Sequence, residues 1–321
     1  MQHVWTPGRV NLIGEHIDYH SLSVLPMALT QGLDLAFEPR TDSVIRASSP
    51  GYAAVEFEWR PDLQPVAAGS WENYLRAAAL AVARRWGAGR GINASVHSTL
   101  PAAAGLSSSS ALIVAFTLAL LRANSQTATF DDLMQVLPDG EQFVGTRGGG
   151  MDHAAVLASR AGFASLVSFH PPAVEHIPIP PDWAFLVIDS GVRAEKSGAA
   201  RERYNAVRHS PAAPAHVASE SERVAAAVAA MLFEDASAFG KLLLESHASL
   251  RDRLAVSHPE LDLIVESAIH AGAHGARLTG AGFGGSVVAL FSRESLAAAQ
   301  SALSQYWKIF EAHAGPGALV S

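Results

Sequence analysis

Cysteine is absent from this chain of 321 residues, which excludes disulfide bonds and thiolate metal sites. Basic residues are outnumbered by acidic ones. The chain has 23 lysines and arginines and 30 aspartates and glutamates, which gives a net charge of −7. This balance argues against a surface for nucleic acid or anionic membrane. No apolar run reaches the roughly 18 to 20 residues of a membrane span, and residues 1–5 lack the start of a signal peptide. We therefore expect a cytoplasmic protein.

Several common catalytic motifs are missing as well. There is no Gly-x-x-x-x-Gly-Lys-Ser/Thr phosphate loop, no His-Glu-x-x-His zinc site and no Gly-x-Ser-x-Gly nucleophile motif. Residues 280–285 match the Gly-x-Gly-x-x-Gly dinucleotide pattern, but a strand-like run follows where a helix should begin. The sequence therefore indicates neither a P-loop protein, a zinc protease nor a dinucleotide-binding fold, and a serine hydrolase is disfavoured.

What the chain does contain is 49% apolar and 17% charged residues, which is typical of a globular protein with a sizeable core. Its length suits one large domain or two ordinary ones. Expected helices and strands are mixed in both halves without regular βαβ alternation, which indicates the α+β class. Because proline becomes frequent between residues 162 and 181, we predict two domains, residues 1–165 and 166–321.

Glycine and proline set the bounds of the expected elements. Residues 23–30 and 33–38 are expected to form separate strands. Pro138 is expected to divide a helical region into two short pieces, 131–136 and 141–144, because proline disfavours a helix interior.

The segment Leu100–Ala111 (Leu-Pro-Ala-Ala-Ala-Gly-Leu-Ser-Ser-Ser-Ser-Ala) joins a strand-like run to a strongly apolar run at 112–121. A small-residue loop that enters a helix presents unpaired N–H groups and the positive end of the helix dipole, which together suit a phosphate. The four serines add hydroxyls that can bind phosphate oxygens or a metal ion. The alternative is an ordinary N-cap in a flexible turn, and the segment alone leaves both readings open.

A second polar segment, Pro7–Tyr19, holds Arg9, Glu15, His16 and Asp18 within ten residues. The planar fork of arginine suits a phosphoryl group. Closely placed Glu, His and Asp side chains can bind several sugar hydroxyls, because carboxylates accept hydrogen bonds and histidine can donate or accept. The alternative is a polar surface turn with ordinary charges.

A glycine-rich segment, Gly145–Asp152, places an aspartate where a helix is expected to begin. Asp152 can act as a general base toward a substrate hydroxyl, or it can simply cap the helix. Glu141 lies just upstream and can bind Mg²⁺, which takes few protein carboxylates together with phosphate oxygens.

Three segments and their order resemble the galacto-, homoserine, mevalonate and phosphomevalonate (GHMP) kinases. Pro7–Tyr19 is similar to the galactokinase signature Pro-Gly-Arg-Val-Asn-Leu-Ile-Gly-Glu-His-Thr-Asp-Tyr, with Ile17 in place of Thr. Leu100–Ala111 resembles the nucleotide phosphate loop of that family, and Arg277–Gly285 resembles its C-terminal glycine motif. The resemblance covers nearly the whole chain, and the first segment is specific for the galactokinase branch.

This resemblance implies an N-terminal domain like the second domain of ribosomal protein S5 and a ferredoxin-like C-terminal domain, with the active site between them. By motif match, Asp152 would be the catalytic base, and Arg9 would steady both Asp152 and the phosphoryl group. Mg²⁺ would be held by Ser109 and Glu141. The residues expected to line the sugar pocket are Glu15, His16, Asp18, Gly149 and Tyr204. The residues expected to bind ATP are Gly105, Leu106, Ser107, Ser108, Ser109 and Ser110, with Trp71 and Asn73 beside adenine.

The predicted activity is ATP-dependent phosphorylation of the anomeric C1 hydroxyl of galactose or a related sugar. The expected partners are the sugar and ATP, with no nucleic acid and no membrane. His153 stands where galactokinases usually carry Gln, and the Gly145–Asp152 segment is more similar to the N-acetylgalactosamine kinase form. The alternatives are a kinase for N-acetylgalactosamine, arabinose or another small hydroxyl substrate, and a non-catalytic galactose sensor of the same fold.

Overall fold

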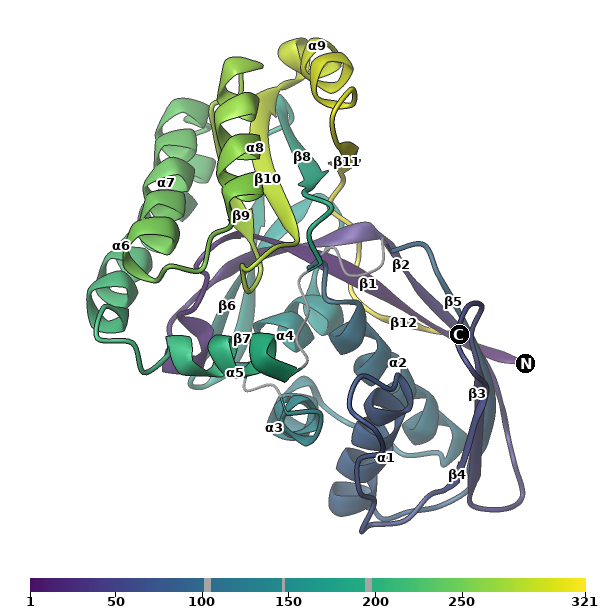
Figure 1. The fold of residues 1–321 in the computed structure, drawn as a ribbon. Helices are drawn as coiled ribbons and strands as arrows, with labels where there is room; N and C mark the ends of the chain where they lie inside the picture. Colours follow the sequence, from purple (N-terminus) through teal and green to yellow (C-terminus); the bar gives the residue numbers. More distant parts are fainter. Residues whose placement is uncertain (101–104, 146–147, 194–197) are drawn as a thin grey trace.

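A computed structural model describes residues 1–100, 105–145, 148–193 and 198–321. The lower part of Figure 1 is built around a six-stranded sheet and the upper part around a four-stranded sheet, and strand β1 (Gln2–Ile13) runs along their junction. None of the helices that these residues form is both long and apolar enough to span a membrane.

The first sheet has the strand order β12-β1-β2-β5-β3-β4, and all neighbouring strands are antiparallel except β3 and β5. In β5, buried Ile92, Ala94 and Val96 alternate with exposed residues, which is the pattern of a strand covered on one face. The strands are β1, β2 (Leu25–Pro39), β3 (Val44–Ser48), β4 (Val55–Glu58), β5 (Ile92–Ser98) and β12 (Leu319–Val320). Three helices share a hydrophobic core with this sheet: α1 (Glu72–Trp86), α2 (Ser108–Ala123) and α3 (Phe130–Phe143).

Helix α2 follows the serine loop, as the apolar run predicts. Apolar side chains occupy all of its faces, so the helix is buried along most of its length. Ser107, its N-cap, adopts a left-handed backbone conformation with φ of 59°. In the first turn, Ser108 is exposed and Ser109 is half-buried, so both remain accessible to a ligand.

The second sheet has the order β11-β8-β10-β9, with all neighbours antiparallel. Along the chain, one strand is followed by helices, two strands, a helix and a last strand, which is the ferredoxin-like arrangement. The predicted α+β class with a ferredoxin-like second half is therefore confirmed. The strands are β8 (Trp183–Asp189), β9 (Gly275–Thr279), β10 (Ser286–Ser292) and β11 (Lys308–Ala312). The helices are α5 (Gly198–Val207), α6 (Ala213–Leu232), α7 (Ala236–Ala248), α8 (Pro259–His270) and α9 (Arg293–Leu303), and a π-helical turn (Ser249–Arg253) follows α7.

Along the chain, helix α4 (Met151–Ala158) and a hairpin of strands β6 (Phe163–Phe169) and β7 (Pro172–Pro178) follow α3 and precede β8. Strand β12 pairs with the start of β1, so the last strand of the chain belongs to the first sheet, and the two termini lie close together in Figure 1. The predicted domain boundary at residue 165 stays a prediction.

Two predictions about local structure are wrong. Helix α3 is continuous through Pro138, because a capping box between Thr129 and Asp132 fixes its start and buried Leu133 and Leu137 pack it against the core. Residues 23–30 and 33–38 do not form separate strands, since β2 runs unbroken over that region and pairs with β1 along most of its length. Strands β7, β11 and β12 were not predicted, because they are short and rich in proline or mixed residues.

Candidate active site

The centre of the site is an ion pair between β1 and the start of α4. The Nε atom of Arg9 donates to Oδ1 of Asp152 at 2.6 Å, and both side chains are buried. The hydroxyl of Ser107 donates to the other carboxylate oxygen, Oδ2. Three segments far apart in the sequence therefore meet at the Asp152 carboxylate.

Arg9 also binds the serine loop directly. Its NH1 atom donates to the carbonyl of Gly105 at 2.8 Å, and its backbone N–H donates to the carbonyl of Leu106 at 3.1 Å. These bonds fix the loop against β1. The first two residues predicted to bind ATP therefore use their carbonyl groups to hold the arginine.

Ser110 lies between two buried carboxylates. Its hydroxyl oxygen is 2.7 Å from Oε1 of Glu141 and 3.3 Å from Oδ2 of Asp152. A hydroxyl has one proton to donate, so the shorter contact with Glu141 is the stronger hydrogen bond. The structure thus places Ser110 against Glu141, whereas Ser109 lines the neighbouring cavity. The metal-binding role of Ser109 stays a prediction.

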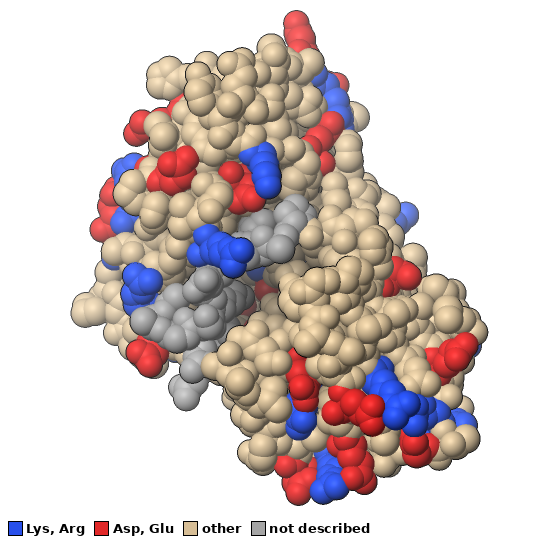
Figure 2. Space-filling view, turned by 45° about the vertical axis from the view of Figure 1, so that its right-hand side comes forward, with Lys and Arg blue, Asp and Glu red and all other residues tan. Residues whose placement is uncertain are grey.

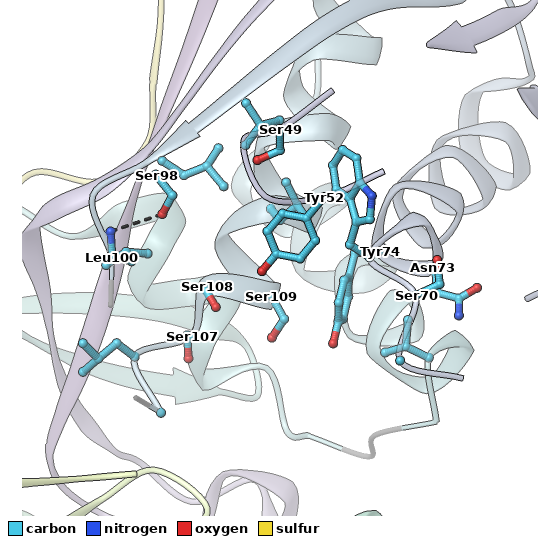
Figure 3. Close-up of a pocket in the computed structure, with 18 of the residues that line it drawn as sticks. Ser49, Tyr52, Ser70, Asn73, Tyr74, Ser98, Leu100, Ser107, Ser108 and Ser109 are labelled. Atoms are coloured by element: carbon cyan, nitrogen blue, oxygen red, sulfur yellow. Dashed lines mark hydrogen bonds between the residues drawn. The ribbon is translucent and has the colours of Figure 1, made fainter. Parts of the chain in front are cut away.

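A cavity of about 770 Å³ opens beside the serine loop. Its volume is within the usual range for small-molecule sites. Ser107, Ser108 and Ser109 lie toward one end of this cavity, Ser70 and Asn73 lie toward the other, and aromatic rings stand between them (Figure 3). The aromatic residues that line it are Tyr52, Trp71, Tyr74 and Phe143.

Trp71 and Asn73, the residues expected beside adenine, both line this cavity, and their role in binding ATP stays a prediction. The ring centroid of Trp71 is 5.7 Å from that of Tyr52. The Asn73 amide is instead bound to the loop before it, because its Oδ1 accepts from the N–H of Val66 at 2.8 Å and its Nδ2 donates to the carbonyl of Ala67 at 3.0 Å. Asn73 therefore shapes the wall, and Tyr52 is a wall residue that the sequence reasoning missed.

A second, smaller cavity shares Arg9 with the first. It brings together most of the residues predicted for the sugar pocket and adds the start of the C-terminal glycine turn. The residues that line it are Arg9, Glu15, His16, Asp18, Glu141, Gly148, Gly150, Met151, Asp152, Tyr204, Gly280 and Ala281.

Glu15 is held by both halves of the chain. Its carboxylate forms a buried ion pair with Arg277, and it accepts from Asn11 Nδ2 at 2.6 Å and from the N–H of Gly280 at 2.7 Å. Burial raises the pKa of Glu15 to about 7, although the nearby Arg277 charge acts in the opposite direction. Arg277 is itself fully buried, and its role in holding Glu15 was not predicted.

His16 uses both of its ring nitrogens inside the protein. Nε2 lies 3.1 Å from the carbonyl of Ala281, which can only accept, so Nε2 carries the proton and Nδ1 accepts from the hydroxyl of Tyr19 at 3.0 Å. Burial lowers the pKa of His16 to about 3, so the ring is neutral near neutral pH. Its ring centroid is 5.8 Å from that of Tyr204.

Asp18 lines this cavity, whereas Gly149 contacts Asp18 and lines a neighbouring cavity with Tyr19 and Arg208. The N–H of Gly149 donates to Oδ2 of Asp18 at 2.9 Å. A Cβ atom at Gly149 would lie 2.2 Å from the backbone carbonyl carbon of Asp18, so only glycine permits this approach. Burial and the nearby Asp152 charge raise the pKa of Asp18 to about 6.

The donor set around Glu141 is compatible with Mg²⁺. In the parts of the chain that the structure describes, no group of three His, Cys, Asp or Glu side chains is arranged as a metal site. Mg²⁺ does not need such a cluster, because it takes oxygen ligands, few of them protein carboxylates, and phosphate oxygens complete its shell. Glu141 and the serine hydroxyls supply only oxygen ligands, so they fit this ion.

On the face drawn in Figure 2, acidic and basic side chains are mixed, without a continuous patch of one sign.

Known protein families match both halves of the chain. Three family descriptions match the chain: "Galactokinase galactose-binding signature" at residues 3–39, "GHMP kinases N terminal domain" at 73–160 and "GHMP kinases C terminal" at 224–309. The first covers the Arg9–Asp18 segment, and the second covers the serine loop together with Glu141 and Asp152.

Individual relatives match over nearly the whole chain. The chain is 35% identical to a galactokinase from Chloroflexus aurantiacus, over 92% of this chain and 85% of that protein. It is 34% identical to a galactokinase from Streptomyces coelicolor, over 98% of this chain and 93% of that protein. The fold is similar to the crystal structure of Lactococcus lactis galactokinase complexed with galactose, with a TM-score of 0.90, 24% identity, and coverage of 99% and 94% of the two chains.

Proposed function

Because the chain belongs to the galactokinase family of GHMP kinases, we propose that it transfers the γ-phosphoryl group of ATP to the C1 hydroxyl of galactose or a close relative. One observation carries this proposal: the large cavity and the small cavity both include Arg9, and its ion pair with Asp152 lies where they meet. A nucleotide in the first cavity and a sugar in the second would therefore face each other across these two residues.

In this reaction, Asp152 accepts the proton of the C1 hydroxyl while the hydroxyl oxygen bonds to the γ-phosphorus. The bond between the γ-phosphorus and the β–γ bridging oxygen breaks, and ADP leaves with that oxygen. Arg9 orients the Asp152 carboxylate and offsets the negative charge on the phosphoryl group during its transfer. Phosphoryl transfer depends mainly on such positioning and charge stabilisation.

The remaining predicted residues have roles that follow from their positions. The backbone N–H groups at the start of α2, with Ser108 and Ser109, would bind the phosphates, and Trp71 would stack on adenine. Glu141 and Ser109 would hold Mg²⁺, which supplies positive charge to the phosphates when it is bound.

The sugar would lie between the two predicted domains, residues 1–165 and 166–321. Asp18 and Tyr204 line the space in which its hydroxyls would bind, and Gly149 would hold Asp18 in place. The raised pKa of Asp18 lets this carboxyl donate or accept around pH 6. Glu15 and His16 support this wall with most of their hydrogen-bonding groups already bound within the protein.

The test is sugar-dependent release of ADP from ATP and Mg²⁺, measured with galactose, N-acetylgalactosamine, arabinose and no sugar. We expect galactose or one of the related sugars to stimulate release. Asp152→Asn should lower turnover by about 10²-fold or more, since removing one stabilising group at a reaction centre typically has that effect. Asp131→Asn, on the exposed start of α3, is the matched control and should leave turnover unchanged.

Binding of galactose without any ADP release would instead support the sensor. Turnover of Asp152→Asn equal to wild type would contradict the assignment of the base.

A further inference from the structure

The turn that carries Glu15, His16 and Asp18 is strained by itself. His16 has a φ of 61°, in the left-handed region that side chains other than glycine rarely adopt, and Gly14 has a φ of 104°. Such a turn persists only where surrounding structure holds it in place. Several of the groups that hold the backbone of this turn come from the second half of the chain.

Helix α6 contacts the backbone of this turn with two side chains that are one helical turn apart. Oε1 of Glu220 accepts from the N–H of Gly14 at 3.0 Å, and Nε2 of His216 lies 2.9 Å from the carbonyl of Glu15. Both side chains are fully buried, although α6 is an otherwise amphipathic helix with exposed residues on its other face. Neither residue belongs to a motif, and the sequence reasoning gave them no role.

Each of the two side chains is in turn held by a serine. Ser246 donates to Oε1 of Glu220 at 2.6 Å. The carbonyl of Glu15 can only accept, so Nε2 of His216 carries the proton, and Nδ1 accepts from the hydroxyl of Ser249 at 2.9 Å. Their orientations and the tautomer of His216 are therefore fixed before any ligand binds.

Direct packing brings the turn against the same helix. A Cβ atom at Gly14 would lie 3.0 Å from Cγ2 of Val224 on α6 and 3.1 Å from the Cα atom of Val24. Buried Arg277 adds a third hydrogen bond to the segment, from NH1 to the carbonyl of Leu12 at 2.9 Å. The segment from residue 12 to residue 15 is thus bound at three successive points by the second half of the chain.

We propose that Glu220 and His216 are positioning residues for sugar binding: they hold the Gly14–Glu15 backbone so that the side chains that follow face the sugar. This inference rests on the proposed function. It makes α6 part of the sugar site without direct contact with the sugar. A displacement of about 1 Å at a reaction centre can lower its rate by about 10²-fold, so the loss of these two anchors should be visible in kinetics.

The test compares Glu220→Ala with Glu220→Gln by steady-state kinetics. The alanine variant removes the acceptor for the Gly14 N–H, so we expect the KM for the sugar to rise about tenfold or more, as expected when a buried hydrogen bond to a charged group is lost. The KM for ATP should stay within about twofold, because the nucleotide cavity does not touch α6. Glu220→Gln keeps an oxygen that can accept from Gly14 but replaces the oxygen that accepts from Arg223 with an NH2 group. The sugar KM should therefore rise less than in Glu220→Ala.

The matched control is Glu222→Gln, an exposed glutamate two residues along the same helix, which should leave both KM values unchanged.

If Glu220→Ala does not fold, Ser249→Ala serves in its place. It removes only the hydrogen bond to Nδ1 of His216 and should raise the sugar KM by a few-fold. Equal effects of either variant on the KM values for sugar and ATP, or no effect on either, would overturn the proposal. A wild-type enzyme that does not act on any sugar would instead contradict the proposed function itself.

Discussion

The large cavity, which we propose binds the nucleotide, draws most of its walls from one stretch, residues 33–145. The small cavity, which we propose binds the sugar, joins residues 9–18 to residues 141–152, 204 and 280–281. The first is wide and lined by rings and small polar side chains. The second is narrow and is held by buried charges. Binding a flexible, charged nucleotide needs an accessible surface with N–H donors, whereas a neutral sugar is selected by hydroxyl partners fixed at defined positions.

This difference predicts different sensitivities to substitution. Buried charges are strongly destabilising when one partner is removed, because the other charge stays in a medium of low polarity. Removing an aromatic side chain from the wall of an open cavity should lower the free energy of unfolding by less. Substitutions at the small cavity should therefore lower the free energy of unfolding more than substitutions at the large cavity. The two sets should also change the KM of different substrates.

The largest effect is expected from Arg277→Met. It leaves Glu15 buried with only the Asn11 and Gly280 donors, so we expect the free energy of unfolding to fall by about 3 to 5 kcal/mol. Urea unfolding at pH 7, followed by tryptophan fluorescence, measures it. The double variant Arg277→Met/Glu15→Gln should recover part of the loss, because it removes the uncompensated charge. A single variant as stable as wild type would show that the sugar side does not depend on this pair.

A smaller effect is expected from Trp71→Ala on the nucleotide side. Removing a ring that stacks on a base should raise the KM for ATP about tenfold, while the KM for the sugar stays near that of wild type. Initial-rate measurements with each substrate varied in turn separate the two. Trp86→Ala, at the other end of α1 and also half-buried, controls for loss of packing. An equal rise in both KM values would contradict the separation of the two sides.

The last prediction concerns the pH dependence of stability. The pKa of Asp18 is raised from 3.8 to about 6 in the folded protein, so the folded state holds a proton that the unfolded state has already lost between these pH values. Stability from this group is therefore present below pH 3.8 and is lost as pH rises through about 6. Asp18→Asn should show a smaller fall in unfolding free energy between pH 4 and pH 7 than wild type. Identical falls in the two proteins would count against this role of Asp18.

The sequence predicted the elements of the nucleotide side well, because they are local. Serine-loop composition and the following apolar run were sufficient to predict the loop entering buried α2. Trp71 lines the large cavity, and its place beside adenine stays a prediction. Prediction was weaker where packing overrides local preference. Pro138 lies inside a continuous helix because the core and a capping box hold it there.

For the small cavity, the motif pointed to residues 9–18, which do line it, but not to the residues that hold this segment in place. Glu15 and His16 were predicted to contact the sugar, and in the folded chain their polar atoms are bound largely by Arg277, Gly280 and Ala281. Nothing in the spacing of residues pairs Glu15 with a residue more than 260 positions away. The sequence of α6 has the pattern of an ordinary amphipathic helix, so it does not single out His216 or Glu220.

The sequence by itself predicted the α+β class and the buried helix after the serine loop, because each depends on residue types and their pattern along the chain. The roles of the serine loop, Arg9 and Asp152 came from the family resemblance and stay predictions. Only the tertiary structure decided which serine contacts Glu141, which groups the Asn73 amide binds, and that α6 and Arg277 hold the backbone of residues 12–15. The physical reason is burial. A polar group removed from water must find a partner wherever the fold supplies one, and that partner is chosen by packing in three dimensions rather than by position along the chain.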